Sequence, residues 1–233
     1  MSSSALFHPH PAPPRAPRAL FPRAFPFAAC ALLLAASVCA RAQTGATRIL
    51  DASALHPPPG ARVAIVEWDD LECPACAHAN PTLMAAAAKY KIPWVRHDLL
   101  IPYHLWSRNA AIRARWFDAK SPALGADYRN QVFANQTYIY NLMALNQFTE
   151  KFAQQHGIAM PFAIDPQAKL AAMVDADNEL GKRTGISLTP TIFIVTAGSR
   201  GAPYIQVADP DRDLYRSIDQ ALADTAPLRT AHK

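Results

Sequence analysis

The feature that most restricts the fold of this chain is a pair of cysteines placed where a strand gives way to a helix. Residues 62–68 form an apolar run rich in β-branched residues, which predicts a buried strand. After a short acidic loop comes Cys73-Pro-Ala-Cys76, and from Pro74 to about Lys91 apolar residues recur at helical spacing. Two cysteines at this spacing can close a small disulfide ring across the first helical turn. The free N–H groups at the helix start favour a thiolate on Cys73, which predicts that Cys73 is the accessible nucleophile.

The order of the remaining elements defines the fold class. Residues 93–97 predict a second strand, and the strand pattern returns at residues 191–195 and 204–207 as a hairpin. Asp209, followed by proline, predicts the start of a last helix that runs to about Ala223. A βαβ unit and a later ββα unit, with helices inserted between them, predict an α/β chain with a small mixed sheet covered on both faces.

A long helical block, about residues 105–185, separates the two groups of strands. Thr149 is expected to cap one of its helices and Gly157 to end one. Asp165, followed by proline, predicts the start of a helix that runs to about Arg183. Five large aromatic residues of the block are expected to form its core rather than a binding platform: Trp106, Trp116, Phe117, Tyr128 and Phe133.

The basic character of the chain is confined to its N-terminus. The formal net charge is +5, and four arginines lie in residues 1–42, which contain no Asp or Glu, so the remainder carries +1. Nothing in that remainder calls for binding to nucleic acid.

Residues 1–42 have the features of a secretory signal. The apolar run Phe25–Cys39 holds 15 residues, which is short for a membrane-spanning helix of about 20 residues. It ends at Ala40-Arg-Ala42, a small-x-small cleavage pattern, so residues 1–42 are expected to be a signal peptide. An uncleaved membrane anchor is the alternative. Both readings predict a periplasmic or otherwise extracytoplasmic protein.

The cysteines and histidines also bear on metal binding. Removal of residues 1–42 would leave Cys73 and Cys76 as the only cysteines, whereas a zinc site needs four ligands. The histidines that would have to complete such a site match no familiar spacing: His78, His97 and His104. We therefore expect neither a metal site nor a small-molecule cofactor.

Three motifs in this order resemble a known family, over about residues 60–225. The motifs that resemble the thioredoxin fold are Val66-Glu-Trp followed after four residues by Cys73-Pro-x-Cys76, then Pro81, and then Thr189-Pro190-Thr191. The helical block is similar to that of the DsbA-like thiol–disulfide oxidoreductases. The resemblance implies an N-terminal half of the thioredoxin-like domain over residues 43–104, a helical insertion over 105–183 and a C-terminal half over 184–233.

The resemblance also implies roles for individual residues. Cys73 matches the exposed nucleophile and Cys76 the buried resolving thiol of a redox-active disulfide. Glu67 matches a buried acid beneath the disulfide, which would handle the proton of Cys76. Pro190 matches the proline whose peptide bond is cis, and the backbone of Thr189 before it would bind an extended substrate strand.

Two features depart from the family pattern and predict weak oxidising power. Ala75 stands where the oxidases of the group often carry histidine. Asp69, Asp70 and Glu72 place negative charge next to Cys73, which is expected to oppose ionisation of its thiol.

The sequence therefore predicts an exported thiol–disulfide oxidoreductase that exchanges disulfides with protein substrates through the Cys73–Cys76 pair. The expected partners are unfolded or reduced exported proteins and a membrane redox protein that resets the pair, and a monomer is expected. The first alternative is the same fold acting as a reductase or isomerase. The second is a non-catalytic metal-binding module, which the two-residue spacing between the cysteines disfavours.

Overall fold

The structure of the protein, a computed structural model, describes residues 47–225. The segment 1–42, expected to be a signal peptide, lies outside these residues. Within the described part, no helix is both long and apolar enough to cross a membrane. In chain order the elements are β1 (Val63–Asp69), α1 (Pro74–Tyr90), β2 (Trp94–Asp98), α2 (Ser107–Asp118), α3 (Pro122–Ala134), the 3-10 helix η1 (Gln136–Tyr138), α4 (Leu142–Gln155), α5 (Lys169–Thr184), β3 (Thr191–Thr196), β4 (Tyr204–Val207) and α6 (Pro210–Thr225).

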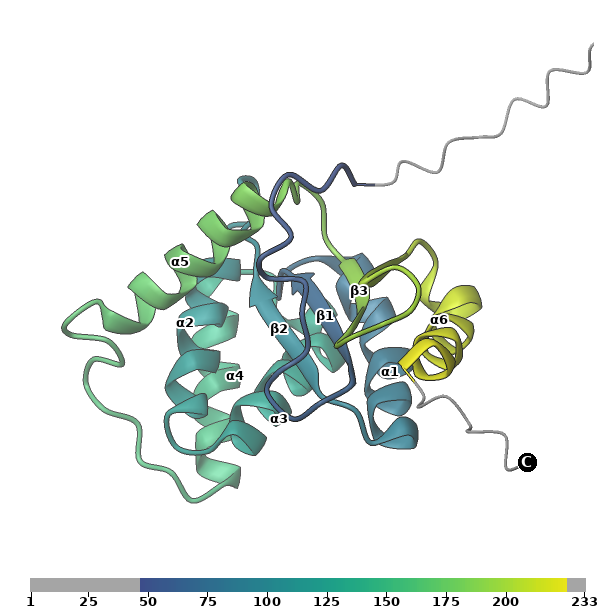
Figure 1. Cartoon of the computed structure of the whole chain (residues 1–233). Coiled ribbons are helices and arrows are strands. Elements are labelled where there is room, and N and C mark those ends of the chain that lie inside the picture. The colour runs from purple at the N-terminus through teal and green to yellow at the C-terminus, as the bar shows by residue number, and fades with distance from the viewer. Residues whose placement is uncertain (1–46, 226–233) are drawn as a thin grey trace, which may run out of the picture. The chain divides into compact units, whose positions relative to one another are not determined.

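The strands form one mixed sheet in the order β2-β1-β3-β4 (Figure 1). β1 pairs in parallel with β2 and antiparallel with β3, and β3 pairs antiparallel with β4. The expected βαβ and ββα units, separated by a helical block, are therefore confirmed. The parallel register sets Glu67 of β1 beside Arg96 of β2, a pairing that recurs in the site below.

Alternate residues of β1 enter two different cores, as expected for a strand covered on both sides. Val63 and Ile65 pack with residues of α1 and α6, which lie side by side in Figure 1. Val66 and Trp68 face the other way, into a core that includes Leu180 of α5. Burial of each large aliphatic side chain contributes about 1.5–3 kcal/mol to the stability of the fold. The buried strand that the sequence predicts is thereby confirmed.

The helical block has an aromatic core that extends to the active-site loop. The five aromatic residues named in the sequence analysis are all buried, as predicted. Phe117 is central, with ring centroids 4.7 Å from Tyr128 and 4.9 Å from Phe152. The same apolar cluster contains Cys73 and Cys76, so the block packs directly against the cysteine pair.

Two predicted helix starts are wrong, for local reasons. Thr149 does not cap a helix but lies buried inside α4, where it donates to Leu145 O (2.7 Å) and meets the Tyr128 hydroxyl at 2.8 Å. A buried tyrosine hydroxyl needs such a partner. α5 begins at Lys169 rather than at Asp165, because the Asp165 carboxylate accepts from the N–H of Ala171 and the intervening residues form a turn.

Candidate active site

The cysteine pair sits at the N-terminus of α1, directly after the loop that leaves β1. Cys73 is the extended N-cap residue, and Pro74 follows it in the first helical turn. The Cys73 N–H donates to Asp70 O (2.9 Å), and its carbonyl accepts the first helical bond from Ala77 N (3.1 Å). Both thiols are free. These bonds hold the Cys73 side chain beside the free N–H groups of the helix start.

The two cysteines differ in accessibility, but less than the sequence predicts. Cys73 is 7% exposed and Cys76 is fully buried. The expectation of an exposed nucleophile is therefore wrong in degree, because the core of the helical block covers most of Cys73. Cys73 is nonetheless the sulfur that retains some contact with solvent.

The two thiols also differ in acidity. The pKa of Cys73 is lowered to about 5, chiefly by a hydrogen bond from the Cys76 thiol and further by the Thr189 side chain and the N–H groups of Cys76 and Ala75. The pKa of Cys76 is raised, first by burial and then by its bond to Cys73. Near neutral pH the pair therefore holds a thiolate on Cys73 and a thiol on Cys76.

The acidic loop before Cys73 does not act as expected. Glu72 Oε2 accepts from Trp106 N (2.6 Å) and Ser107 N (3.0 Å), so its charge lies at the N-terminus of α2, where it is stabilised. Asp70 accepts from the N–H groups of Glu72 (2.8 Å) and Ile101 (2.9 Å). The predicted resistance of Cys73 to ionisation is wrong, because its pKa is lowered in spite of these acids. Each of the two carboxylates accepts from donors in the loops and helix around it.

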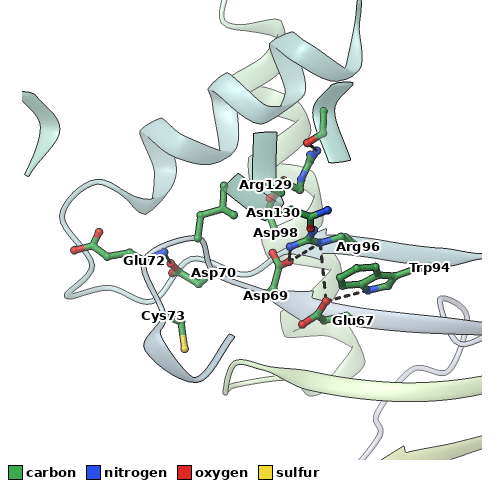
Figure 2. Close-up of polar contacts among 12 residues, drawn as sticks. Glu67, Asp69, Asp70, Glu72, Cys73, Trp94, Arg96, Asp98, Arg129 and Asn130 are labelled. Atoms are coloured by element: carbon green, nitrogen blue, oxygen red, sulfur yellow. Dashed lines mark hydrogen bonds and ion pairs between the residues drawn. The ribbon is translucent and has the colours of Figure 1, made fainter. Parts of the chain in front are cut away.

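Glu67 lies in the interior beneath this loop, as expected for a buried acid (Figure 2). It is 1% exposed, and its Oε2 accepts from Trp94 Nε1 at 3.0 Å and lies 3.9 Å from Arg96 Nε. Burial, followed by the nearby charge of Asp69, raises the pKa of Glu67 to about 8, while Arg96 and Trp94 oppose the rise. The carboxyl group is therefore mostly protonated at neutral pH.

Arg96 is a member of the site that the sequence analysis missed. Its guanidinium donates twice to Asp69 Oδ2, at 2.8 and 2.6 Å, and once to Asn130 Oδ1 at 3.3 Å (Figure 2). It also stacks near the Trp94 and Phe133 rings, 4.6 and 5.3 Å from their centroids. The side chain is 9% exposed. This buried cation forms an ion pair with Asp69, the last residue of β1 and the third of the acids before Cys73.

The loop before β3 reaches the cysteines from the far end of the sequence. The Thr189–Pro190 peptide bond is cis, as the sequence predicts. The Cys73 Sγ lies 3.5 Å from the Thr189 carbonyl oxygen. Both Thr189 and Pro190 are half-buried. The structure thus brings together the two motifs that the sequence separates by more than 100 residues.

Gln136, at the start of η1, is a second residue that the sequence analysis missed. Its Nε2 donates to the carbonyls of Leu71 (3.0 Å) and Cys73 (3.1 Å). One side chain of the helical block therefore binds the backbone on both sides of Glu72. No local sequence pattern marks this contact, since the partners lie more than 60 residues apart.

Among residues 47–225, no group of three or more His, Cys, Asp or Glu side chains could hold a metal ion. The three histidines considered above each lie 3.0 Å from a different carboxylate. The pairs are His78 with Asp211, His97 with Asp177, and His104 with Asp70.

Comparison with known proteins gives the class of the chain. Residues 58–197, more than half of the sequence, match a family described as Thioredoxin, so the chain belongs to the thioredoxin family. No curated protein matches it. Solved structures with a similar fold include alpha-DsbA1 from Wolbachia pipientis, with a TM-score of 0.59 at 14% identity over 73% of this chain and 90% of that one.

Two further solved structures are similar to this chain. DsbA2 from Pseudomonas aeruginosa matches with a TM-score of 0.53 at 18% identity, over 72% of this chain and 93% of that one. A periplasmic thioredoxin-like protein from Salmonella enterica serovar Typhimurium matches with a TM-score of 0.56 at 19% identity, over 72% and 88%. The fold is therefore the DsbA-like form of the thioredoxin fold, and family, fold and dithiol together support a disulfide-exchange enzyme.

Proposed function

We propose that the protein is an exported thiol–disulfide oxidoreductase that exchanges disulfides with protein substrates through Cys73 and Cys76. The observation that carries this proposal is the asymmetry of the pair. Cys73 has a pKa of about 5 and some contact with solvent, whereas Cys76 is fully buried and its pKa is raised. One sulfur is thus suited to attack and the other to resolution.

The proposed reaction starts from the Cys73–Cys76 disulfide. A substrate thiolate attacks Cys73 Sγ, the bond between the two enzyme sulfurs breaks, and Cys76 leaves as a thiolate that takes up a proton. A second substrate thiolate then attacks the substrate sulfur of the mixed disulfide and releases Cys73 as a thiolate. The substrate loses two electrons and gains a disulfide, and the cysteine pair gains those electrons. A membrane redox partner would then accept them and restore the enzyme disulfide.

The low pKa of Cys73 favours the oxidising direction. Stabilisation of a thiolate stabilises the reduced pair, and a pair whose reduced form is stable readily gives up its disulfide to others. The thiol bond from Cys76 and the helix N–H groups supply this stabilisation without a histidine at Ala75. Asp70 and Glu72 accept from N–H groups of other segments, Ile101 and Trp106.

Glu67 is proposed to supply the proton that Cys76 takes up. With a pKa of about 8, Glu67 carries a proton at neutral pH in an interior from which water is largely excluded. Burial, the bond to Cys73 and the charge of Asp69 all raise the pKa of Cys76, so the Cys76 thiolate is a strong base when it forms. A glutamine at position 67 is expected to slow departure of Cys76 when the mixed disulfide forms.

The loop at Thr189 and Pro190 is proposed to guide the substrate. The Thr189 carbonyl lies 3.5 Å from Cys73 Sγ, so its backbone can pair with an extended chain whose cysteine reaches that sulfur. Main-chain pairing tolerates many sequences, which suits an enzyme that acts on unfolded proteins. The proposed domain boundaries are those given above: 1–42, 43–104, 105–183 and 184–233.

The direct test is incubation of the oxidised protein with a reduced, unfolded protein that contains two cysteines. We expect one disulfide to form in the substrate for each enzyme disulfide lost. Reduced Cys76→Ser protein, mixed instead with the disulfide form of the same substrate, should accumulate a mixed disulfide, because Cys73 breaks the substrate disulfide and no second enzyme thiol resolves the product. No transfer, or trapping through another residue, would refute the proposal. Export has its own test, because removal of the signal predicts that the protein recovered outside the cytoplasm begins at Gln43.

A further inference from the structure

A cavity of about 460 Å³ lies between α2, α4 and the loop that joins α4 to α5 (Figure 1). This volume is in the range of pockets that bind small molecules. The apolar wall of the cavity includes Ile112 of α2 and, from the loop, Met160 and Ile164, which also pack against the core of the helical block. Its polar side includes Arg113 of α2 and Asn146 of α4. Among the described residues, none that lines the cavity belongs to the disulfide site.

Arg113 is the cation of this cavity, and its protein partners carry no charge. The side chain is half-buried. Its Nη1 donates to the Asn109 carbonyl at 2.8 Å, and its Nη2 donates to Asn146 Oδ1. Two of the five N–H groups of the guanidinium are therefore bound, both to neutral oxygens. Within residues 47–225, no carboxylate forms an ion pair with Arg113.

Other arginines that the fold withdraws from water are paired with acids. Three of them have a carboxylate oxygen at 2.6 or 2.7 Å: Arg96 with Asp69, Arg115 with Asp98, and Arg129 with Asp118. Burial lowers the pKa of Arg113, and the shift is opposed only by the nearby Tyr128 hydroxyl. Partial removal of a cation from water without a counter-charge costs free energy. An anion that binds in the cavity would offset this cost.

We propose that the cavity binds a small monocarboxylic acid with an apolar body, whose carboxylate pairs with Arg113. This ligand site goes beyond disulfide exchange and does not depend on it, since the cavity is separate from the cysteine pair.

The class of ligand follows from the charges and the shape of the lining. A guanidinium offers parallel N–H groups that match the two oxygens of one carboxylate. Two acids, Glu150 and Asp165, also line the cavity, and Asp165 Oδ2 accepts from Ala171 N at 2.8 Å. These acids would repel a second negative charge, so a phosphate or a dicarboxylate suits the cavity less well. The apolar wall formed by Ile112 and the loop would contact the rest of the ligand.

The test is calorimetric titration of the purified protein with two acids, hexanoate and 4-phenylbutyrate, in a buffer free of carboxylates. Hexanamide and 4-phenylbutyramide serve as uncharged counterparts of the same shape. We expect at least one acid to bind with a Kd below about 1 mM, and its amide to bind at least about tenfold more weakly, because the amide forms no charge-assisted pair with Arg113.

Three variants assign the binding to Arg113. Arg113→Met should weaken binding of the acid by about tenfold or more. Arg108→Met is the matched control and should retain the affinity, because it removes an exposed arginine of the same helix that pairs with Asp175 (2.7 Å) and does not line the cavity. Asn146→Asp places a carboxylate at the oxygen that accepts from Arg113. It should raise the midpoint of denaturant unfolding and weaken acid binding about tenfold, since the cation then has an internal partner.

Asn146 is exposed on α4, so its replacement with an acid of the same shape keeps the test valid even if Arg113→Met does not fold. Absence of binding of both acids below about 1 mM would overturn the proposal. Equal affinity for acid and amide would overturn it too, as would unchanged affinity in Arg113→Met or in Asn146→Asp. Disulfide exchange, measured on the same samples, is expected to be independent of all these results.

Discussion

Replacement of Glu67 with glutamine should change how the stability of the protein depends on pH. Glu67 is almost completely buried, and burial is the main reason that its pKa rises from the ordinary value of 4.5 to about 8. Between these pH values the folded chain keeps a proton on Glu67 that the unfolded chain has released. The free energy of unfolding therefore falls as the pH rises through this window.

The size of the effect follows from the two pKa values. One unit corresponds to about 1.4 kcal/mol, so Glu67 lowers the free energy of unfolding by about 3 kcal/mol at pH 7 and about 5 kcal/mol above pH 8. Glutamine has no proton to release, and its carbonyl can still accept from Trp94 Nε1. Arg96 keeps its two bonds to Asp69. Glu67→Gln is therefore expected to be nearly neutral at about pH 4 and increasingly stabilising at higher pH.

The assay is denaturant unfolding of the reduced wild-type and variant proteins at several pH values between 4 and 9. The difference in unfolding free energy between the two should grow with pH and level off above pH 8. Glu150→Gln, which changes an exposed glutamate of α4, should leave the difference flat. A difference for Glu67→Gln that is independent of pH, or that turns destabilising as pH rises, would refute the assignment of Glu67 as a buried, protonated acid.

Three further changes test other parts of the site. Limited alkylation of the reduced protein should label Cys73 before Cys76, and the labelling rate should be half-maximal near pH 5. The Cys76→Ala variant should move this midpoint to higher pH, because it removes the hydrogen bond that lowers the pKa of Cys73 most. Preferential labelling of Cys76 would contradict the assignment. Arg96→Met should lower the free energy of unfolding by about 3–5 kcal/mol, since it leaves Asp69 buried without its cation. A loss below about 1 kcal/mol in denaturant unfolding would count against this ion pair. Gln136→Leu removes the hydrogen-bond donor of the Leu71 and Cys73 carbonyls and should lower the free energy of unfolding by about 1–3 kcal/mol in the same assay. The free energy of unfolding would stay unchanged only if water replaced both hydrogen bonds.

Local patterns alone were sufficient for much of the fold. The strand that runs into Cys73, the hairpin after Pro190 and the helix from Pro210 were predictable because side-chain period, turn residues and helix caps act over a few neighbouring residues. Burial of five aromatic residues of the helical block was also predictable, because large apolar side chains gain free energy when they leave water: Trp106, Trp116, Phe117, Tyr128 and Phe133. Local rules failed at Thr149, because its side chain forms a hydrogen bond with the Tyr128 hydroxyl inside a helix instead of capping one.

The electrostatic character of the site was decided by tertiary structure. From the sequence, three acids beside Cys73 predict a thiol that resists ionisation, yet Asp69 is bound by Arg96 from the neighbouring strand and Glu72 by the start of α2. Gln136 likewise reaches Cys73 from 63 residues away. The sequence by itself therefore determined which residues carry the sulfur chemistry. Only the tertiary structure decided which charges act on the two sulfurs. The electrostatic interaction depends on the distance between a charge and the sulfur, and strand register and helix packing set that distance.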